Sequence, residues 1–334
     1  MRFDVVRQPL IPAFLSLVIL TTAALCSGVG FVLPADPRWG LTPAELPLLP
    51  LGNALLLFQQ QWPATAKVFT ALLIIYTGLS LGRLTVRCTL YGTGTSLPIP
   101  LFGMVLLGVL PQQLTLKAVV GVMLLALSVK NFARAYRNEF SFDRLFRGSL
   151  FLALLLLVEP AAAPLVLLPV AAVVRFRRTG REALVTLGGL LLPPLTLAYL
   201  NWACGGSLAA PFAALWRNCE GGGPVGAFLL QTSLAERIFL GWLIVLNLLA
   251  MLLFRTNSYN VSMRARHILL FTNSLLLLSL LTLPMPAASA STAALLAVPA
   301  TLLLPVFFIR IHASIAKALY LLWLAATLAG LFLQ

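Results

Sequence analysis

Long runs of apolar residues decide what this chain can fold into. The stretch from Leu10 to Leu33 carries no charged residue, and several later runs are nearly as apolar. A helix needs about 20 such residues to cross a hydrocarbon core about 30 Å thick. Hydrophobic residues make up 60% of the 334 positions and charged residues only 10%, whereas globular chains carry about a quarter charged residues. Because the runs do not alternate with period two, the sequence predicts an all-α, polytopic transmembrane bundle rather than barrel strands.

Charged residues and prolines divide the apolar sequence into candidate spans. Together these form a single integral membrane domain that covers residues 1–334. Eleven spans are expected, and they include a short paired hairpin: 10–33, 64–82, 97–110, 114–130, 148–158, 161–174, 183–203, 238–254, 268–283, 291–309 and 315–333.

The basic residues predict the orientation of these spans. The net charge is +14, but the Lys and Arg residues lie mainly in short segments between apolar runs rather than in a stripe suited to nucleic acid. If the N-terminus is cytoplasmic and the C-terminus is outside, most of the 23 Lys and Arg residues fall on the cytoplasmic side, as the positive-inside rule requires. The five exceptions are Arg38, Lys67, Lys117, Arg217 and Arg237.

The hairpin is expected in the run SLFLALLLLVEPAAAPLVLLPVAAVVRF, residues 149–176. A single helix would carry the four arginines of the following RFRRTGRE to the outer side. Two short limbs that turn at Glu159 and Pro160 keep both ends of the run cytoplasmic, and proline disfavours helix at the residue before it. We therefore expect Glu159 at the outer turn of a hairpin, where water can solvate it.

Two longer segments are expected on the outer side. The first, residues 34–63, is apolar enough to contain an interfacial helix over residues 44–58. The second, residues 205–236, is rich in glycine and is predicted to be irregular.

Few residues on the outer side could support chemistry. Asp36 follows the first span directly in LPADPRW, with Arg38 two residues later. A carboxylate at this position could act as a base or bind a divalent metal, and Arg38 could hold a phosphate. Lys67, Glu159 and Arg217 are further candidates for substrate binding. The alternative for Asp36 is a polar turn, because Asp-Pro commonly opens one.

The four cysteines suggest one disulfide and no metal site. Cys204 and Cys219 fall on the same expected outer side, so they are candidates for a disulfide. With only two histidines, the chain shows no zinc-ligand spacing. YGTGTS, residues 91–96, has two glycines of a dinucleotide fingerprint but follows no strand, and it is interpreted as a loop. No cofactor is expected.

Several longer motifs resemble a known family. These are LPLGNALL, LALSVKNFARAYRNEFSFDRLFRGSLFLALLLL and VRFRRTGREALVTLGGLLLPPLTLAYLNW. From about Leu41 to Gly206 the chain resembles multi-spanning inner-membrane proteins of Bacteroidota whose function is unknown. Some members look like GT-C glycosyltransferases that use polyprenyl-linked sugars. The resemblance implies a catalytic carboxylate in the first outer loop, which here means Asp36 or Glu45. This chain has LLLFQQQWPATAKVF, without acids, where acid-rich relatives carry them.

These features leave three functions open. The first is a non-catalytic scaffold or subunit for cell-envelope biogenesis in a bacterial inner membrane. The second is a GT-C-like transferase that uses a polyprenyl-phosphate-linked glycan, with Asp36 as base or metal ligand. The third is a transporter of lipid or small solutes. Membrane lipids and other envelope proteins are the expected partners, and nucleic acid is not.

Overall fold

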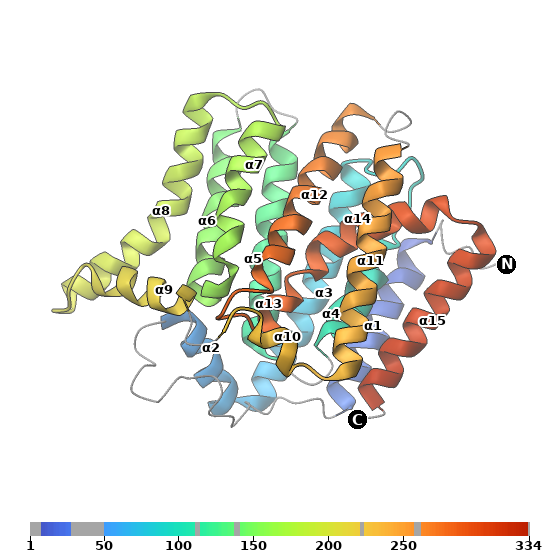
Figure 1. Ribbon diagram of the computed structural model, residues 1–334, viewed down its shortest axis with the longest axis horizontal. Helices are drawn as coiled ribbons and strands as arrows, with labels where there is room; N and C mark the ends of the chain where they lie inside the picture. Colours follow the sequence, from blue (N-terminus) through green and yellow to red (C-terminus); the bar gives the residue numbers. More distant parts are fainter. Residues whose placement is uncertain are drawn as a thin grey trace.

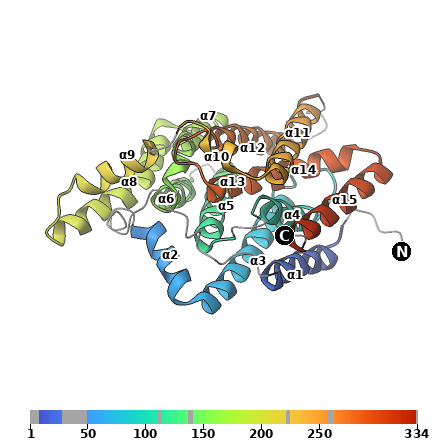
Figure 2. The same cartoon turned by 60° about the horizontal axis from the view of Figure 1, so that its bottom comes forward.

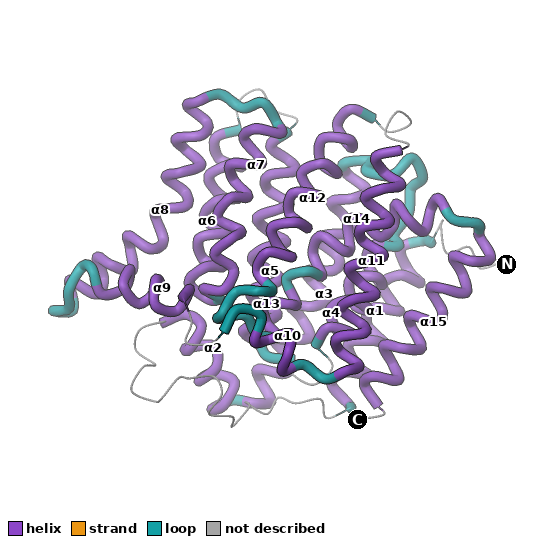
Figure 3. The backbone as a smooth tube through the Cα atoms, in the orientation of Figure 1, coloured by secondary structure: helices purple, strands orange, loops and turns teal. Residues whose placement is uncertain are grey.

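The described residues of the computed structural model form helices and turns, without a strand among them (Figures 1 and 3). They cover 8–27, 50–110, 114–136, 141–220, 224–256 and 262–332. The expected all-α class is confirmed. The helices are α1 (Leu10–Cys26), α2 (Pro50–Gln61), α3 (Pro63–Arg87), α4 (Pro98–Val109), α5 (Leu116–Ala135), α6 (Phe142–Val158), the 3-10 helix η3 (Pro160–Leu167), α7 (Leu168–Arg175), α8 (Gly180–Ala203), α9 (Ala210–Glu220), α10 (Ala227–Gln231), α11 (Leu234–Thr256), α12 (Met263–Thr282), α13 (Ala290–Ala294), α14 (Ala297–Arg310) and α15 (Ala313–Phe332).

Seven helical segments in the described part of the chain are long and apolar enough to cross a membrane. They are α3, α5, α8, α11, α12, the α13–α14 segment and α15. Three shorter apolar segments accompany them, namely α1, α4 and the continuous stretch Pro160–Arg175. Eleven spans were expected, and the long segments among the described residues number seven.

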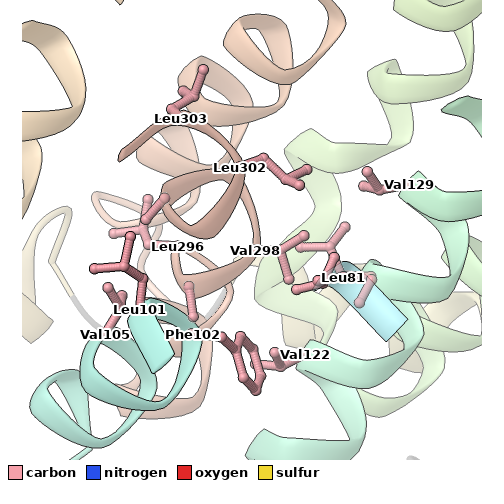
Figure 4. Packing of buried hydrophobic residues seen from close by; sticks show 14 of the residues in the cluster. Leu81, Leu101, Phe102, Val105, Val122, Val129, Leu296, Val298, Leu302 and Leu303 are labelled. Carbon is pink, nitrogen blue, oxygen red and sulfur yellow. The ribbon is translucent and has the colours of Figure 1, made fainter. Parts of the chain in front are cut away.

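The interior of the bundle is built around α4 and the α13–α14 segment. In the segment Ala290–Arg310, 94% of an 18-residue apolar stretch is buried inside the protein. Helix α4 is buried over most of its length. Phe102 and Leu302 are fully buried members of this core (Figure 4). A helix that is apolar on all sides has no polar face to turn toward water, so it belongs inside a bundle.

Glycines allow the central helices to approach closely. A Cβ atom at Gly82 of α3 would overlap the side chain of Ile99 in α4, and one at Gly108 of α4 would overlap the ring of Phe239 in α11. A larger residue at either position would therefore force the facing side chain or the helices to shift. Small residues at helix contacts are typical of membrane bundles, in which tight packing drives association.

The expected helix break and reversal of the chain at Glu159 are confirmed. Helix α6 ends at Val158, and Glu159 has extended dihedral angles, φ −135° and ψ 89°. The chain then packs back on α6 as η3 and continues as α7 toward the upper end of the view in Figure 1. The residues that flank the hairpin meet there, because Arg178 donates to the carbonyl of Ala135 and Ser141 donates to Glu182.

The second outer segment is more regular than predicted. Residues 210–220 form α9 and residues 227–231 form α10, so the expectation of an irregular segment is wrong. The glycines lie at 205, 206 and 221–223 and therefore flank APFAALWRNCE, which is rich in alanine and leucine and forms a helix readily. In the first segment expected on the outer side, α2 covers Pro50–Gln61 and overlaps the helix predicted over residues 44–58, and residues 34–49 lie outside the described residues.

Candidate functional site

A buried ion pair joins the hairpin turn to the start of α5. Glu159, the residue between α6 and η3, has a side chain that is only 6% exposed. Its Oε2 atom lies 3.0 Å from Nζ of Lys117, which belongs to the first turn of α5 and is 20% exposed. The break in the helix creates this contact, because it places a carboxylate at the end of α6 beside the beginning of the neighbouring helix.

Two hydroxyl groups complete the surroundings of the carboxylate. Ser291 donates to Oε2 at 2.6 Å and Thr292 donates to Oε1 at 3.2 Å. Both residues belong to α13, whose N-cap Ser289 lies 2.6 Å, Oγ to Oγ, from Ser291. Glu159 therefore has three donors on two oxygens, and each donor belongs to α5 or α13.

Helix α2 closes one side of this ion-pair cluster, which we define as Lys117, Glu159, Ser289, Ser291 and Thr292. A Cβ atom at Gly52 would lie 2.7 Å from the carbonyl oxygen of Val158 and 3.5 Å from Cε of Lys117. Only glycine allows α2 to approach the hairpin turn so closely.

Further contacts hold the elements around the cluster. The side chain of Gln59 in α2 accepts a hydrogen bond from the amide of Leu116 at 2.8 Å. Cys219 of α9 donates to the carbonyl of Pro160 at 3.4 Å. Figure 2 brings this end of the molecule forward, with α2, α9 and α13 around the ends of α5 and α6. Five elements from distant parts of the sequence thus meet at one helix break.

The electrostatics favour a closed, fully bonded cluster. Burying a carboxylate and an ammonium costs several kcal/mol each, and their attraction offsets this only with good geometry and additional hydrogen bonds. Glu159 has both, with a 3.0 Å ion pair and two hydroxyl donors. Removing one partner would leave the other as an uncompensated buried charge. The arrangement can hold these helices together, and loss of either charge would destabilise it.

The structure corrects one sequence interpretation and supplies a partner for the residue concerned. Glu159 was expected at a solvated turn, but it is buried because α2, α9 and α13 cover the turn. Lys117, one of the five basic residues not expected on the cytoplasmic side, pairs with Glu159. Both residues were expected on the same side of the membrane, and this was a weak indication in the sequence that they could pair.

The other predicted site residues lie apart from this cluster or outside the described residues. Asp36, Arg38 and Glu45 fall within the undescribed range 28–49. Lys67 lies in the second turn of α3 and is half-buried, and Arg217 is exposed on α9. Neither is among the partners of Glu159. Among the described residues, no group of three or more His, Cys, Asp or Glu side chains could hold a metal ion.

The predicted disulfide does not form in the structure. Cys204 and Cys219 are both free thiols. Cys204 is exposed at the end of α8, while Cys219 lies in the last turn of α9 beside Pro160. The regular helix α9 separates the two positions, because it carries Cys219 away along its length. Burial raises the pKa of the Cys219 thiol, so the thiol stays protonated as a hydrogen-bond donor.

A second buried carboxylate lies near the opposite end of α5. Glu182, in the first turn of α8, forms an ion pair with Arg178 at 3.1 Å and accepts from Ser141 at 3.3 Å. It also accepts from the amide of Thr179, and the Thr179 side chain accepts from the Glu182 amide in return, which is a capping box. Sequence reasoning did not single out Glu182, although the spacing TGRE contained the signal.

Comparison of the chain with models of known protein families, with curated proteins and with solved structures gives no match.

Proposed function

We propose that this chain crosses a bacterial inner membrane eleven times. The seven long helical segments supply seven crossings, and α1, α4, α6 and the η3–α7 limb supply four more, 7 + 4 = 11. Helix α4 has 12 residues, and at 1.5 Å per residue it extends about 18 Å, less than a hydrocarbon core. It can be short because most of its length is buried among other helices of the protein.

The distribution of charge supports a cytoplasmic N-terminus and an outer C-terminus. Basic residues gather where the C-terminal ends of α3, α5 and α7 meet the N-terminal ends of α8 and α12. Arg144 donates to the carbonyl of Arg134 at 2.8 Å, and a ring nitrogen of His267 lies 3.1 Å from the carbonyl of Arg175. By the positive-inside rule this end is cytoplasmic, and the ion-pair cluster then lies toward the outer side.

The role we propose is that of a non-catalytic scaffold or subunit in cell-envelope biogenesis, in contact with membrane lipids and other envelope proteins. The observation that supports this role is that both carboxylate oxygens of Glu159 already have donors within the protein. Its two oxygens already have three intramolecular donors, so the carboxylate is committed to joining helices. An acid that served as a nucleophile or base would need an open position toward a substrate.

The test uses a deletion strain that carries a variant gene in place of the wild type. In the double variant Lys117→Met with Glu159→Gln, both charges are removed together while the side-chain volumes are nearly kept. A scaffold should still restore normal surface glycans and lipid-linked intermediates, provided that its amount in the membrane equals that of the wild type. Failure at normal abundance would contradict the scaffold.

Transport is the second candidate, because the ion pair lies at a helix break near the expected outer ends of the spans. Ionisable residues inside a membrane domain often mark ion or proton pathways. If the protein is a transporter, the double variant would be present at normal abundance, yet it would not restore normal surface glycans and lipid-linked intermediates. Uptake or efflux in vesicles with and without a proton gradient would then identify the coupled ion.

The transferase alternative rests on different residues. It requires Asp36 as base or metal ligand, with Arg38, Lys67 or Arg217 near the phosphate of a polyprenyl-linked glycan. Replacing Asp36 with Asn in the same deletion strain separates this function from the others. Accumulation of a lipid-linked sugar in the Asp36→Asn strain, with normal abundance of the protein, would favour the transferase over the scaffold.

A further inference from the structure

A pocket lies at the end of α3, in a part of the molecule that the ion-pair cluster does not reach. Its volume is about 410 Å³. The last turn of α3, the loop that leads to α4 and the start of α12 form its walls. The lining residues include Thr89, Tyr91, Gly92, Thr93, Gly94 and Ser262. This volume falls in the lower part of the range of small-molecule sites, about 300–1,000 Å³.

The loop at this cavity presents donors that nothing else in the described chain uses. The backbone amides of Gly92, Thr93 and Gly94 donate to no other described residue. The hydroxyl oxygen of Thr93 is buried and has no hydrogen-bond partner among the described residues. Backbone amides without a partner inside the protein can donate to a bound anion.

The loop is fixed on both sides of these donors. The hydroxyl of Tyr91 donates to the carbonyl of Leu302 in the buried helix α14 at 2.7 Å. The amide of Ser96 donates to the carbonyl of Gln8 at 3.1 Å, and the amide of Leu97 donates to the side chain of Thr95 at 3.2 Å. The free donors therefore belong to a segment that is anchored to the core at one end and to the start of the chain at the other.

An arginine lies beside the cavity. Arg264 lies two residues after the lining residue Ser262, and its guanidinium donates to Sγ of Cys88 at 3.2 Å, beside the lining residue Thr89. Burial raises the pKa of the Cys88 thiol, which stays neutral and does not offset the arginine.

More cations lie around the last turns of α3. Lys130 lies close enough to Arg134, Arg87 and Arg83 for electrostatic repulsion between these side chains. The two described carboxylates at this end are engaged elsewhere, since Asp143 pairs with Arg147 and Glu182 pairs with Arg178. The local charge near the cavity is therefore positive, which concentrates anions.

We propose that this cavity binds a phosphate group, held by the amides of residues 92–94 and the Thr93 hydroxyl in the positive field of Arg264 and its neighbours. The phosphate can belong to the headgroup of an anionic lipid or to a soluble phosphorylated compound. Both present the same anionic oxygens, and the experiment below distinguishes them. This site is independent of the scaffold role, since it uses none of the residues of the ion-pair cluster.

The two glycines allow a direct test because the protein leaves space around them. No heavy atom lies within 4 Å of a Cβ atom placed on Gly92 or Gly94, and neither has a positive φ. Alanine should therefore be tolerated by the fold, while its methyl group adds bulk at two residues that line the cavity. Gly188 of α8, which is exposed and equally unobstructed, provides the matched control.

The experiment compares the full-length chain with three variants in detergent or in nanodiscs. The variants are Gly92→Ala with Gly94→Ala, Thr93→Val, and the control Gly188→Ala. One probe is glycerol 3-phosphate, followed by the shift of the thermal unfolding midpoint. The other is phosphatidylglycerol, counted by native mass spectrometry with phosphatidylcholine as the reference lipid.

We expect wild type and Gly188→Ala to bind at least one probe equally well. The double glycine variant and Thr93→Val should each bind about tenfold more weakly or worse, which corresponds to loss of one hydrogen bond to a charged group. Saturable phosphatidylglycerol binding without an effect of glycerol 3-phosphate assigns a lipid headgroup, and binding of glycerol 3-phosphate assigns a soluble compound. Binding of neither probe, or equal binding by wild type and the two cavity variants, would overturn the proposal.

Discussion

Glu159 and Glu182 are both buried carboxylates, but their partners come from different distances along the chain. Arg178, one partner of Glu182, lies four residues away, and Thr179 lies three residues away. One partner of Glu159, Ser291, is 132 residues distant, and its other partners, Lys117 and Thr292, are also remote. Glu182 thus fixes the local start of a helix, whereas Glu159 fixes the relative positions of α5, the hairpin and α13.

The difference predicts unequal consequences when a charge is removed. Glu182 keeps the amide and hydroxyl of Thr179 even without its arginine, because the capping box forms whenever α8 forms. Within the described part of the chain, Glu159 has only side-chain donors, and each depends on tertiary packing. The long-range cluster should therefore be the more sensitive of the two.

Lys117→Met should have the largest effect. It leaves the Glu159 carboxylate buried without its cation, and breaking a buried pair in this way costs about 3–5 kcal/mol. The measurement is the free energy of unfolding of the purified protein in mixed micelles. Adding Glu159→Gln should recover most of the loss, because the second charge is then removed as well. A loss below about 1 kcal/mol for Lys117→Met would contradict the proposed role of the pair, and Lys317→Met on α15 is the control.

Arg178→Met is the matched change in the local pair, and its effect should be smaller. Glu182 retains the Thr179 amide at 3.0 Å and the Ser141 hydroxyl at 3.3 Å. We expect a loss of about 1.5–3 kcal/mol, typical of a hydrogen bond to a charged group, and this loss includes the hydrogen bond from Arg178 to the carbonyl of Ala135. The same unfolding measurement applies. If Arg178→Met proved more damaging than Lys117→Met, the distinction between local and long-range fastening would be wrong.

The same distinction explains what could be predicted from sequence. The all-α class, the helix break at Glu159 and the hairpin follow from runs of apolar residues, a proline and flanking arginines, which are local features. The capping box at Thr179 and Glu182 was also available from local spacing. The partners Ser291 and Thr292 were not, because nothing near them in sequence indicates that α13 packs against α5. The helix α9 was missed for another reason, since the glycines that suggested an irregular loop only flank it.

Removing single hydroxyl groups compares the two clusters on a finer scale. Ser291→Ala deletes the 2.6 Å hydrogen bond to Glu159 and should cost about 1.5–3 kcal/mol, because the acceptor is a buried carboxylate. Thr179→Ala deletes an N-cap and should cost about 1 kcal/mol. Unfolding of the two variants under identical conditions measures the difference. Equal losses would show that burial of Glu159 adds nothing to the strength of its hydroxyl contacts.

The ion pair of Asp143 and Arg147 provides the lower limit of the comparison and the smallest predicted effect. Its atoms lie 2.8 Å apart, closer than those of the Lys117–Glu159 pair, but its side chains are 67% and 63% exposed. Water and salt screen such a pair, and exposed pairs at i,i+4 contribute about 0.3–0.5 kcal/mol. Asp143→Asn should therefore change the free energy of unfolding by no more than about 0.5 kcal/mol, and less at 1 M salt than at 0.1 M. A larger loss would mean that distance, rather than burial and the number of additional donors, decides how strongly these carboxylates hold the bundle together.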